Sequence, residues 1–293
     1  MTTTEDVKPN IYIPTGCKTL DQLGKPQIRC AIQGPPFSGK TTGSLTFPYP
    51  CLLSYDKKAE THRHRTDVIS VPMYDPEFVN KIVPKAGIQA PVNRKEALLK
   101  WLYTEGIKLT PEQTLIADGS TMIEEEYHIW FRFNEDTLAS TKTGGKNEFI
   151  EWRLKGEYFG ELFAAFAAMK CNIIYICHET PDRDKKGELN GKIRPLLTGQ
   201  IGDKLGGKMT DFFRAINITK PVTPEQRKKT MDWARIDETT LNEWIKSVPE
   251  KHDTLYLWQT QGDELCDCGT TSLFNQPKYI LANYSSFAKY RKQ

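Results

Sequence analysis

The sequence lacks a strong charge of either sign and has no long hydrophobic run. Its 40 basic and 37 acidic residues give a formal net charge of +3, which is too small for the whole surface to attract a polyanion. The longest apolar stretch, ELFAAFAAM, is far shorter than the roughly 20 residues of a membrane-spanning helix. The N-terminus, MTTTEDVKPN, lacks the basic and apolar regions of a secretion signal. We therefore expect a cytoplasmic protein without a membrane span, in which any polyanion contact is local.

The cysteines indicate neither a disulfide framework nor a zinc motif. There are seven of them, an odd number, and nothing marks the chain as secreted. Cys266 and Cys268 are close in sequence, but no second cysteine pair or histidine pair accompanies them at a zinc-binding spacing. We therefore expect reduced thiols and no metal held by cysteine.

No internal repeat and no long linker divides the chain into several domains. A length of 293 residues, 38% of them hydrophobic, suits one elaborated α/β domain with a large core. We assign residues 1–26 to an N-terminal extension and residues 27–290 to a single domain.

Short apolar runs bounded by Pro, Gly or Asp predict strands, and periodic segments between them predict helices. Between residues 149 and 170 an apolar side chain recurs every four positions, which is typical of a core-facing helix. Residues 93–105 and 120–133 also fit helices. The alternation predicts an α/β fold whose mainly parallel sheet is flanked by helices and extended by antiparallel strands near the C-terminus. The expected strands are 28–33, 50–55, 67–71, 114–118, 171–177, 212–218, 229–236 and 253–260.

A phosphate-binding loop follows the first expected strand. Residues 31–45, AIQGPPFSGKTTGSL, contain the spacing G-x-x-x-x-G-K-T between a strand and a helix, as this motif requires. Glycines let backbone N–H groups surround the phosphates, Lys40 reaches the β- and γ-phosphates, and Thr41 offers a hydroxyl to Mg²⁺. The predicted nucleotide-binding residues are Gly34, Pro35, Pro36, Phe37, Ser38, Gly39, Lys40, Thr41 and Thr42.

A second motif supplies a carboxylate for the metal. In TLIADGST an apolar strand ends at Asp118, which would lie beside Mg²⁺ together with Thr41. Gly119 follows where a glutamate could have activated water, so that base must come from elsewhere. Asp56, at the end of CLLSYD, and Glu60 are the candidates, although both could also be solvated loop charges.

A third apolar strand, in NIIYICHE, ends at His178. Related enzymes have a polar residue at this place that senses the γ-phosphate, so His178 is the candidate sensor. A histidine that closes a strand can equally be a structural hydrogen-bonding group.

Together with GGKMTDFFRAINI and QPKYILANYSSF, these segments resemble the phage-encoded RecA-like AAA nucleotide-binding proteins. The studied members of that family are ATP-dependent single-strand DNA annealing recombinases. The resemblance implies a RecA-like P-loop NTPase core that binds ATP and Mg²⁺ between neighbouring subunits of a homo-oligomer. It also implies a role in DNA recombination in the host cytoplasm, with single-stranded DNA and a single-strand-binding protein as partners.

The resemblance further implies that DNA lies along the loops after the Asp118 and His178 strands. The first loop, residues 139–147, is glycine-rich, and the second, residues 182–208, has seven basic and four acidic residues. Contacts of such a loop with phosphates give salt-sensitive affinity without reading the sequence. The candidate DNA-binding residues are Lys142, Lys146, Arg183, Lys185, Lys186, Lys192 and Arg194.

One departure from the family keeps alternatives open. Relatives often have a glutamate two residues after the aspartate of the second strand, where this chain has Lys58. Hydrolysis could therefore be slow, or Glu60 could replace the missing base. The alternatives are another nucleic-acid motor or loader, a nucleotide or small-molecule kinase, and a nucleotide-dependent switch with little turnover. Lys204, Lys208 and Arg214 are candidates for a finger that reaches a neighbour's γ-phosphate.

Overall fold

The structure is a computed structural model that describes residues 26–84, 90–140, 147–183, 186–197, 200–249 and 252–291. Nearly all of the predicted N-terminal extension lies outside these ranges. Six parallel strands form the centre of the described sheet. They are β1 (Arg29–Gly34), β2 (Pro50–Ser54), β3 (Ile69–Pro72), β4 (Thr114–Asp118), β5 (Asn172–Arg183) and β7 (Asp211–Thr219).

Antiparallel strands extend this centre. The sheet order is β10-β8-β7-β1-β5-β4-β2-β3, and β6 and β9 pair with β5 and β7 outside this path. The predicted fold class, a mainly parallel sheet with an antiparallel C-terminal extension, is therefore confirmed. These added strands are β6 (Leu189–Pro195), β8 (Thr254–Gln259), β9 (Gly269–Thr270) and β10 (Tyr279–Leu281).

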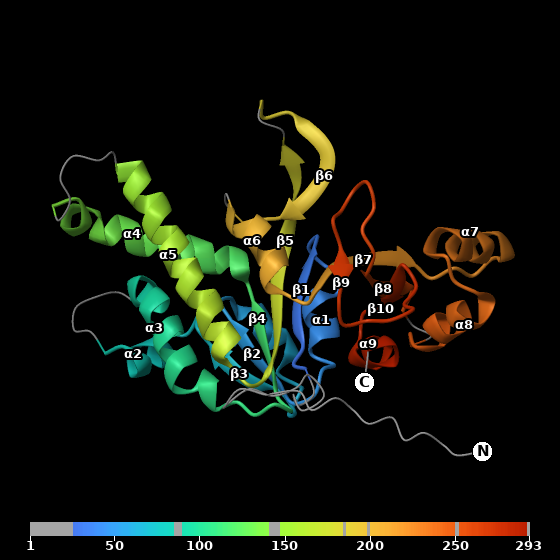
Figure 1. Cartoon of the computed structure of the whole chain (residues 1–293). Coiled ribbons are helices and arrows are strands. Elements are labelled where there is room, and N and C mark those ends of the chain that lie inside the picture. Colours follow the sequence, from blue (N-terminus) through green and yellow to red (C-terminus); the bar gives the residue numbers. More distant parts are fainter. Residues whose placement is uncertain are drawn as a thin grey trace, which may run out of the picture.

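Helices cover both faces of the sheet (Figure 1). No helix within the described ranges has both the length and the apolar character needed to cross a membrane. The three helices expected from periodicity are present as α3, α4 and α5. The helices are α1 (Lys40–Ser44), α2 (Pro76–Ile82), α3 (Ala90–Thr104), α4 (Ser120–Ser140), α5 (Asn147–Ala168), α6 (Gln200–Lys208), α7 (Pro224–Ala234), α8 (Glu238–Lys246) and α9 (Tyr284–Tyr290), with short 3-10 turns at η2 (Lys57–His62) and η3 (Gly106–Lys108).

Alternate side chains of the strands divide the core into two layers. Ala31 of β1 belongs to the layer beneath α2 to α6. Its neighbour Ile32 belongs to the opposite layer, where Phe47 and Phe287 pack. A third cluster joins α7 and α8 to β8 and β10. The apolar centre thus holds the carboxyl ends of β1 and β4 beside Ile176 and His178 of β5, at the edge where α/β proteins bind ligands.

The prediction of a strand over residues 229–236 is wrong, because most of this segment lies in α7. The Thr223 hydroxyl accepts a hydrogen bond from the Gln226 backbone N–H at 3.2 Å, and the Gln226 side chain accepts one from the Thr223 N–H at 3.1 Å. Pro224 occupies the first turn. This reciprocal cap begins a helix and outweighs the strand-like apolar run that follows.

Two expectations about the strand that contains NIIYICHE are also wrong. These are its end at His178 and the loop over residues 182–208. β5 continues to Arg183 and pairs antiparallel with β6. The two strands form a hairpin that projects away from the body of the protein (Figure 1), and α6 follows it. Polar, exposed strand residues leave no apolar pattern to predict such an extension.

Candidate nucleotide-binding site

The predicted phosphate loop connects β1 to α1 and rests on two distant strands. Gly39 has a φ of 78°, and a Cβ on it would come within 2.6 Å of the Tyr256 ring of β8. The Asn217 side chain of β7 donates a hydrogen bond to the Phe37 carbonyl at 3.3 Å. Asn217 and Tyr256 are register partners. Glycine is therefore required at position 39 by both backbone conformation and space.

Lys40 places a positive charge inside the loop. Its ammonium donates hydrogen bonds to the carbonyls of Gly34 and Pro35 at 2.9 and 2.6 Å. The side chain is buried, and this burial lowers the pKa of Lys40, while the nearby Asp118 carboxylate opposes the shift. An ammonium with several donors in such a loop can bind phosphate oxygens.

The two predicted metal-binding residues are in direct contact. The Thr41 hydroxyl donates a hydrogen bond to the Asp118 carboxylate at 2.6 Å, across 77 positions of sequence. Burial raises the pKa of Asp118, and the hydrogen bond from Thr41 offsets part of that shift. A hydroxyl and a carboxylate provide the oxygen ligands that Mg²⁺ prefers, so the residues present fit this ion.

The two candidate bases occupy different surroundings. The Asp56 carboxylate accepts a hydrogen bond from the Lys58 N–H at 3.0 Å, and its charge contributes to the pKa shifts of Asp118 and His178. Glu60 is hydrogen-bonded to Tyr74, whose pKa is raised by burial and by this carboxylate. The structure therefore brings Asp56, rather than Glu60, into the electrostatic surroundings of Asp118.

We expect Asp56→Asn to reduce ATP turnover about a hundredfold while ATP stays bound, because a positioned general base contributes at least this much. Asparagine can still cap η2, so the local fold should survive. Glu60→Gln, the matched amide variant, should keep near-normal turnover. Single-turnover hydrolysis and ATP binding are measured for both proteins. The opposite ranking would move the base to Glu60.

His178 lies between the loop and Asp118 because β5 separates β1 from β4. It is the register partner of Gly34, and Ile176, two residues earlier, is the partner of Asp118. Its Nδ1 is buried and has no hydrogen-bond partner among the described residues. Burial, together with Lys40 and Lys58, lowers the pKa of His178. The lowered pKa favours the neutral imidazole of His178, and its unpaired Nδ1 lies beside the phosphate loop.

An ion pair that the sequence did not predict lies next to His178. Arg214 of β7 donates to both Glu179 carboxylate oxygens, at 2.9 and 3.0 Å, and the two side chains are largely buried. Like Asp118, the Glu179 carboxylate opposes the lowering of the Lys40 pKa by burial. Arg214 is thus paired within its own chain, and its role as a finger toward a neighbour stays a prediction. The side chain of Lys204 lies outside the described residues.

The candidate DNA-binding residues divide between described and undescribed parts of the chain. Lys142, Lys146 and Lys185 lie outside the described residues. The others lie in or beside the hairpin of β5 and β6. They are Arg183, Lys186, Lys192 and Arg194.

Fold and site together define a P-loop nucleotide-binding protein: a strand, a glycine-containing loop with Lys40, and an Asp118 strand whose carboxylate meets Thr41. The comparison with protein families agrees. Residues 26–234, more than two thirds of the chain, match the family described as the AAA domain. The chain therefore belongs to the AAA domain family, a family of P-loop ATPases. A comparison with curated proteins finds no match.

Proposed function

We propose that this protein binds ATP and Mg²⁺ at the phosphate loop, hydrolyses ATP, and couples this cycle to single-stranded DNA. The observation that carries the ATPase part is the 2.6 Å hydrogen bond between Thr41 and Asp118. It joins the phosphate loop to the carboxylate that a metal-dependent ATPase needs.

Each residue of the site has a separate task in this proposal. Lys40 exchanges its bonds to loop carbonyls for bonds to phosphate oxygens, and Thr41 and Asp118 hold the metal. Mg²⁺, when bound, neutralises charge on the phosphate oxygens. Asp56 accepts a proton from water, and the free nitrogen of His178 responds to the γ-phosphate.

The test of this function is ATP turnover with and without single-stranded DNA, measured together with the mass of the complex. We expect DNA to change turnover and ATP to favour a homo-oligomer. ATP turnover that does not respond to DNA would favour a function unrelated to DNA. Transfer of phosphate to a small acceptor would favour the alternative of a nucleotide or small-molecule kinase.

A nucleotide-dependent switch is the second candidate, and one observation favours it. Lys58, whose side chain lies 3.6 Å from the Asp56 carboxylate, competes for the candidate base. A protein with this pair intact would hold ATP for long periods. Tight ATP binding with negligible single-turnover hydrolysis, with or without DNA, would support the switch over the ATPase.

For DNA, we propose the hairpin of β5 and β6 as the contact surface. It carries Lys192 and Arg194 on β6, and Arg183 closes β5. Arg194 is 3.3 Å from Asp182, and Lys192 is 3.7 Å from Asp267, in half-exposed or exposed pairs. Such pairs contribute little to stability, so phosphates can replace the carboxylates.

We expect simultaneous Lys185→Ala, Lys186→Ala and Lys192→Ala to weaken single-stranded DNA binding and to flatten its salt dependence. Each lost phosphate contact should reduce the log–log slope by about 0.7. Anisotropy of a labelled oligonucleotide across a salt series measures both effects. The control removes the same charge from the exposed Lys228, Lys229 and Lys246 on α7 and α8. Equal slopes for both triple variants would exclude the hairpin.

We also expect His178→Ala to reduce the effect of ATP on DNA affinity, with at most a few-fold loss of ATP affinity. The reason is that β5 runs from His178 directly into the hairpin. DNA affinity is measured with and without ATP for the variant and the unmodified protein. An unchanged ratio of the two affinities would return His178 to a structural role.

A further inference from the structure

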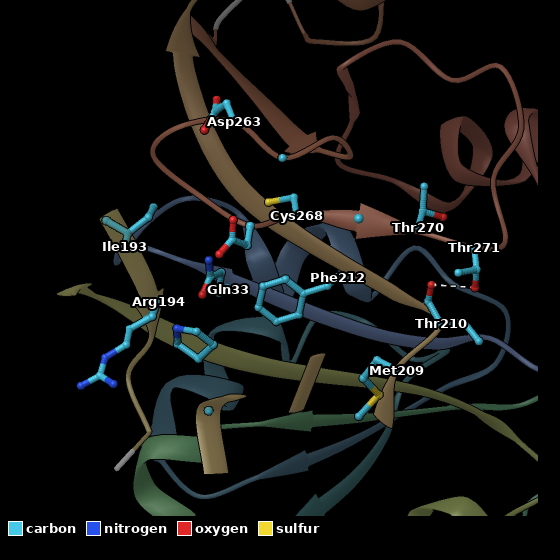
Figure 2. A pocket seen from close by; sticks show the side chains of 15 residues that line it. Gln33, Ile193, Arg194, Met209, Thr210, Phe212, Asp263, Cys268, Thr270 and Thr271 are labelled. Carbon is cyan, nitrogen blue, oxygen red and sulfur yellow. Dashed lines mark hydrogen bonds between the residues drawn. The ribbon is translucent and has the colours of Figure 1, made fainter. Parts of the chain in front are cut away.

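A cleft of about 910 Å³ lies beside the base of the hairpin, and its described lining includes none of the residues assigned to ATP. Residues of β6, of β7 and of the segment 262–271 line it (Figure 2). Cys268 is one of the lining residues, and the Gln33 side chain of β1 is another. The cleft gives small solutes access to Cys268, and Cys266 lies buried next to it.

The two sulfur atoms are close and firmly positioned. The Sγ atoms of Cys266 and Cys268 are 3.3 Å apart, and the Gln33 side-chain amide donates a hydrogen bond to the Cys266 sulfur at 2.8 Å. The Asp263 carboxylate accepts hydrogen bonds from the N–H groups of Leu265 and Cys266, both at 3.0 Å. A disulfide bond is about 2 Å long, so the sulfurs need to approach by only about 1 Å.

The two thiols differ in acidity. A hydrogen bond from Cys268 lowers the pKa of Cys266, and Gln33 and the Arg214 guanidinium contribute in the same direction. The same hydrogen bond and burial raise the pKa of Cys268. These shifts favour a thiolate at Cys266, while Cys268 is the sulfur that lines the cleft.

Among the described cysteines, Cys266 alone has a lowered pKa. Cys30, Cys51, Cys171 and Cys177 are buried, and burial raises the pKa of each. Within the described ranges, no group of three or more His, Cys, Asp or Glu side chains is arranged to hold a metal ion. The Cys266 and Cys268 pair thus stands apart in its chemistry.

We propose that Cys266 and Cys268 form a reversible dithiol–disulfide site that reacts with small peroxides. One of the two sulfurs, as its thiolate, attacks one peroxide oxygen, the O–O bond breaks, and hydroxide leaves, so that this cysteine becomes a sulfenic acid. The second sulfur then attacks the oxidised sulfur, the S–O bond breaks, and the departing oxygen takes the proton of the attacking thiol to leave as water. The two thiol sulfurs together lose two electrons, and the peroxide gains them.

The site can be tested on the full chain without reference to ATP. The protein is treated with hydrogen peroxide, denatured, alkylated with iodoacetamide and digested with trypsin. Residues 252–278 form one tryptic peptide whose only cysteines are Cys266 and Cys268. After peroxide treatment we expect this peptide to carry no alkyl label and to be two hydrogen atoms lighter than the reduced, unlabelled peptide. Reduction with dithiothreitol before alkylation should restore both labels. Peptides with Cys30 or Cys51 serve as internal controls and should keep their labels.

Single variants test the order of the two steps. We expect dimedone to trap a sulfenic acid at the remaining cysteine of both Cys268→Ser and Cys266→Ser, and the variant that is trapped faster identifies the sulfur that peroxide oxidises first. Circular dichroism checks that both variants fold, and the disulfide mapping of the unmodified protein needs no variant. Full labelling of peptide 252–278 after peroxide, or a disulfide between Cys266 and a different cysteine, would overturn the proposal.

Discussion

Lys40→Ala is expected to bind ATP about a hundredfold more weakly than the unmodified protein. The ammonium is the charge of the phosphate loop, and losing its charged hydrogen bonds to phosphate corresponds to about 3 kcal/mol. In the structure its side chain bonds to Gly34, Pro35 and Ser38 within the loop. The fold should therefore survive the substitution, and calorimetric titration with ATP measures the effect.

Lys57→Ala provides the matched control for this experiment. Lys57 is an exposed lysine at the start of η2, so its loss removes the same charge from the same end of the sheet. We expect its ATP affinity to change no more than a few-fold, because exposed charges are screened by solvent and salt. If folded Lys40→Ala binds ATP as well as Lys57→Ala does, the phosphate-loop assignment fails.

Local signals in the sequence predicted the centre of this site. Apolar runs ended at Gly34 and Asp118, and buried parallel strands bring such ends to one edge of the sheet. The contact of Thr41 with Asp118 follows from that rule. Asn217 and Tyr256, which support the loop, could not be predicted, because nothing near them in sequence indicates a partner about two hundred residues away.

The hairpin and α7 show two other limits of sequence interpretation. β5 changes from a buried parallel strand to an exposed antiparallel one after His178, so its apolar run ends long before the strand does. In α7 a short apolar run suggested a strand, while the cap formed by Thr223 and Gln226 determined the helix. The hydrophobic pattern of the sequence alone does not distinguish an exposed strand from an exposed helix, because both consist mainly of polar residues.

Asp118→Asn is expected to retain ATP but to lose Mg²⁺-dependent turnover by about a hundredfold. The amide has almost the same shape and can still accept the hydrogen bond from Thr41, but it removes the negative charge that holds the metal. Turnover measured over a series of Mg²⁺ concentrations should show that the variant needs far more metal. Asp75→Asn is the control, since this half-exposed aspartate caps α2 and asparagine caps equally well.

The pH dependence gives an independent check on Asp118. Burial raises its pKa, so the carboxylate takes up a proton at a higher pH than an exposed aspartate does. Turnover of the unmodified protein should therefore fall on acidification at limiting Mg²⁺, and added Mg²⁺ should move the fall to lower pH by favouring the charged form. The residual turnover of Asp118→Asn should lack this metal-dependent shift, because the amide does not titrate. Normal Mg²⁺-dependent turnover by Asp118→Asn would place the metal on other residues, and the contact between Thr41 and Asp118 would then be structural.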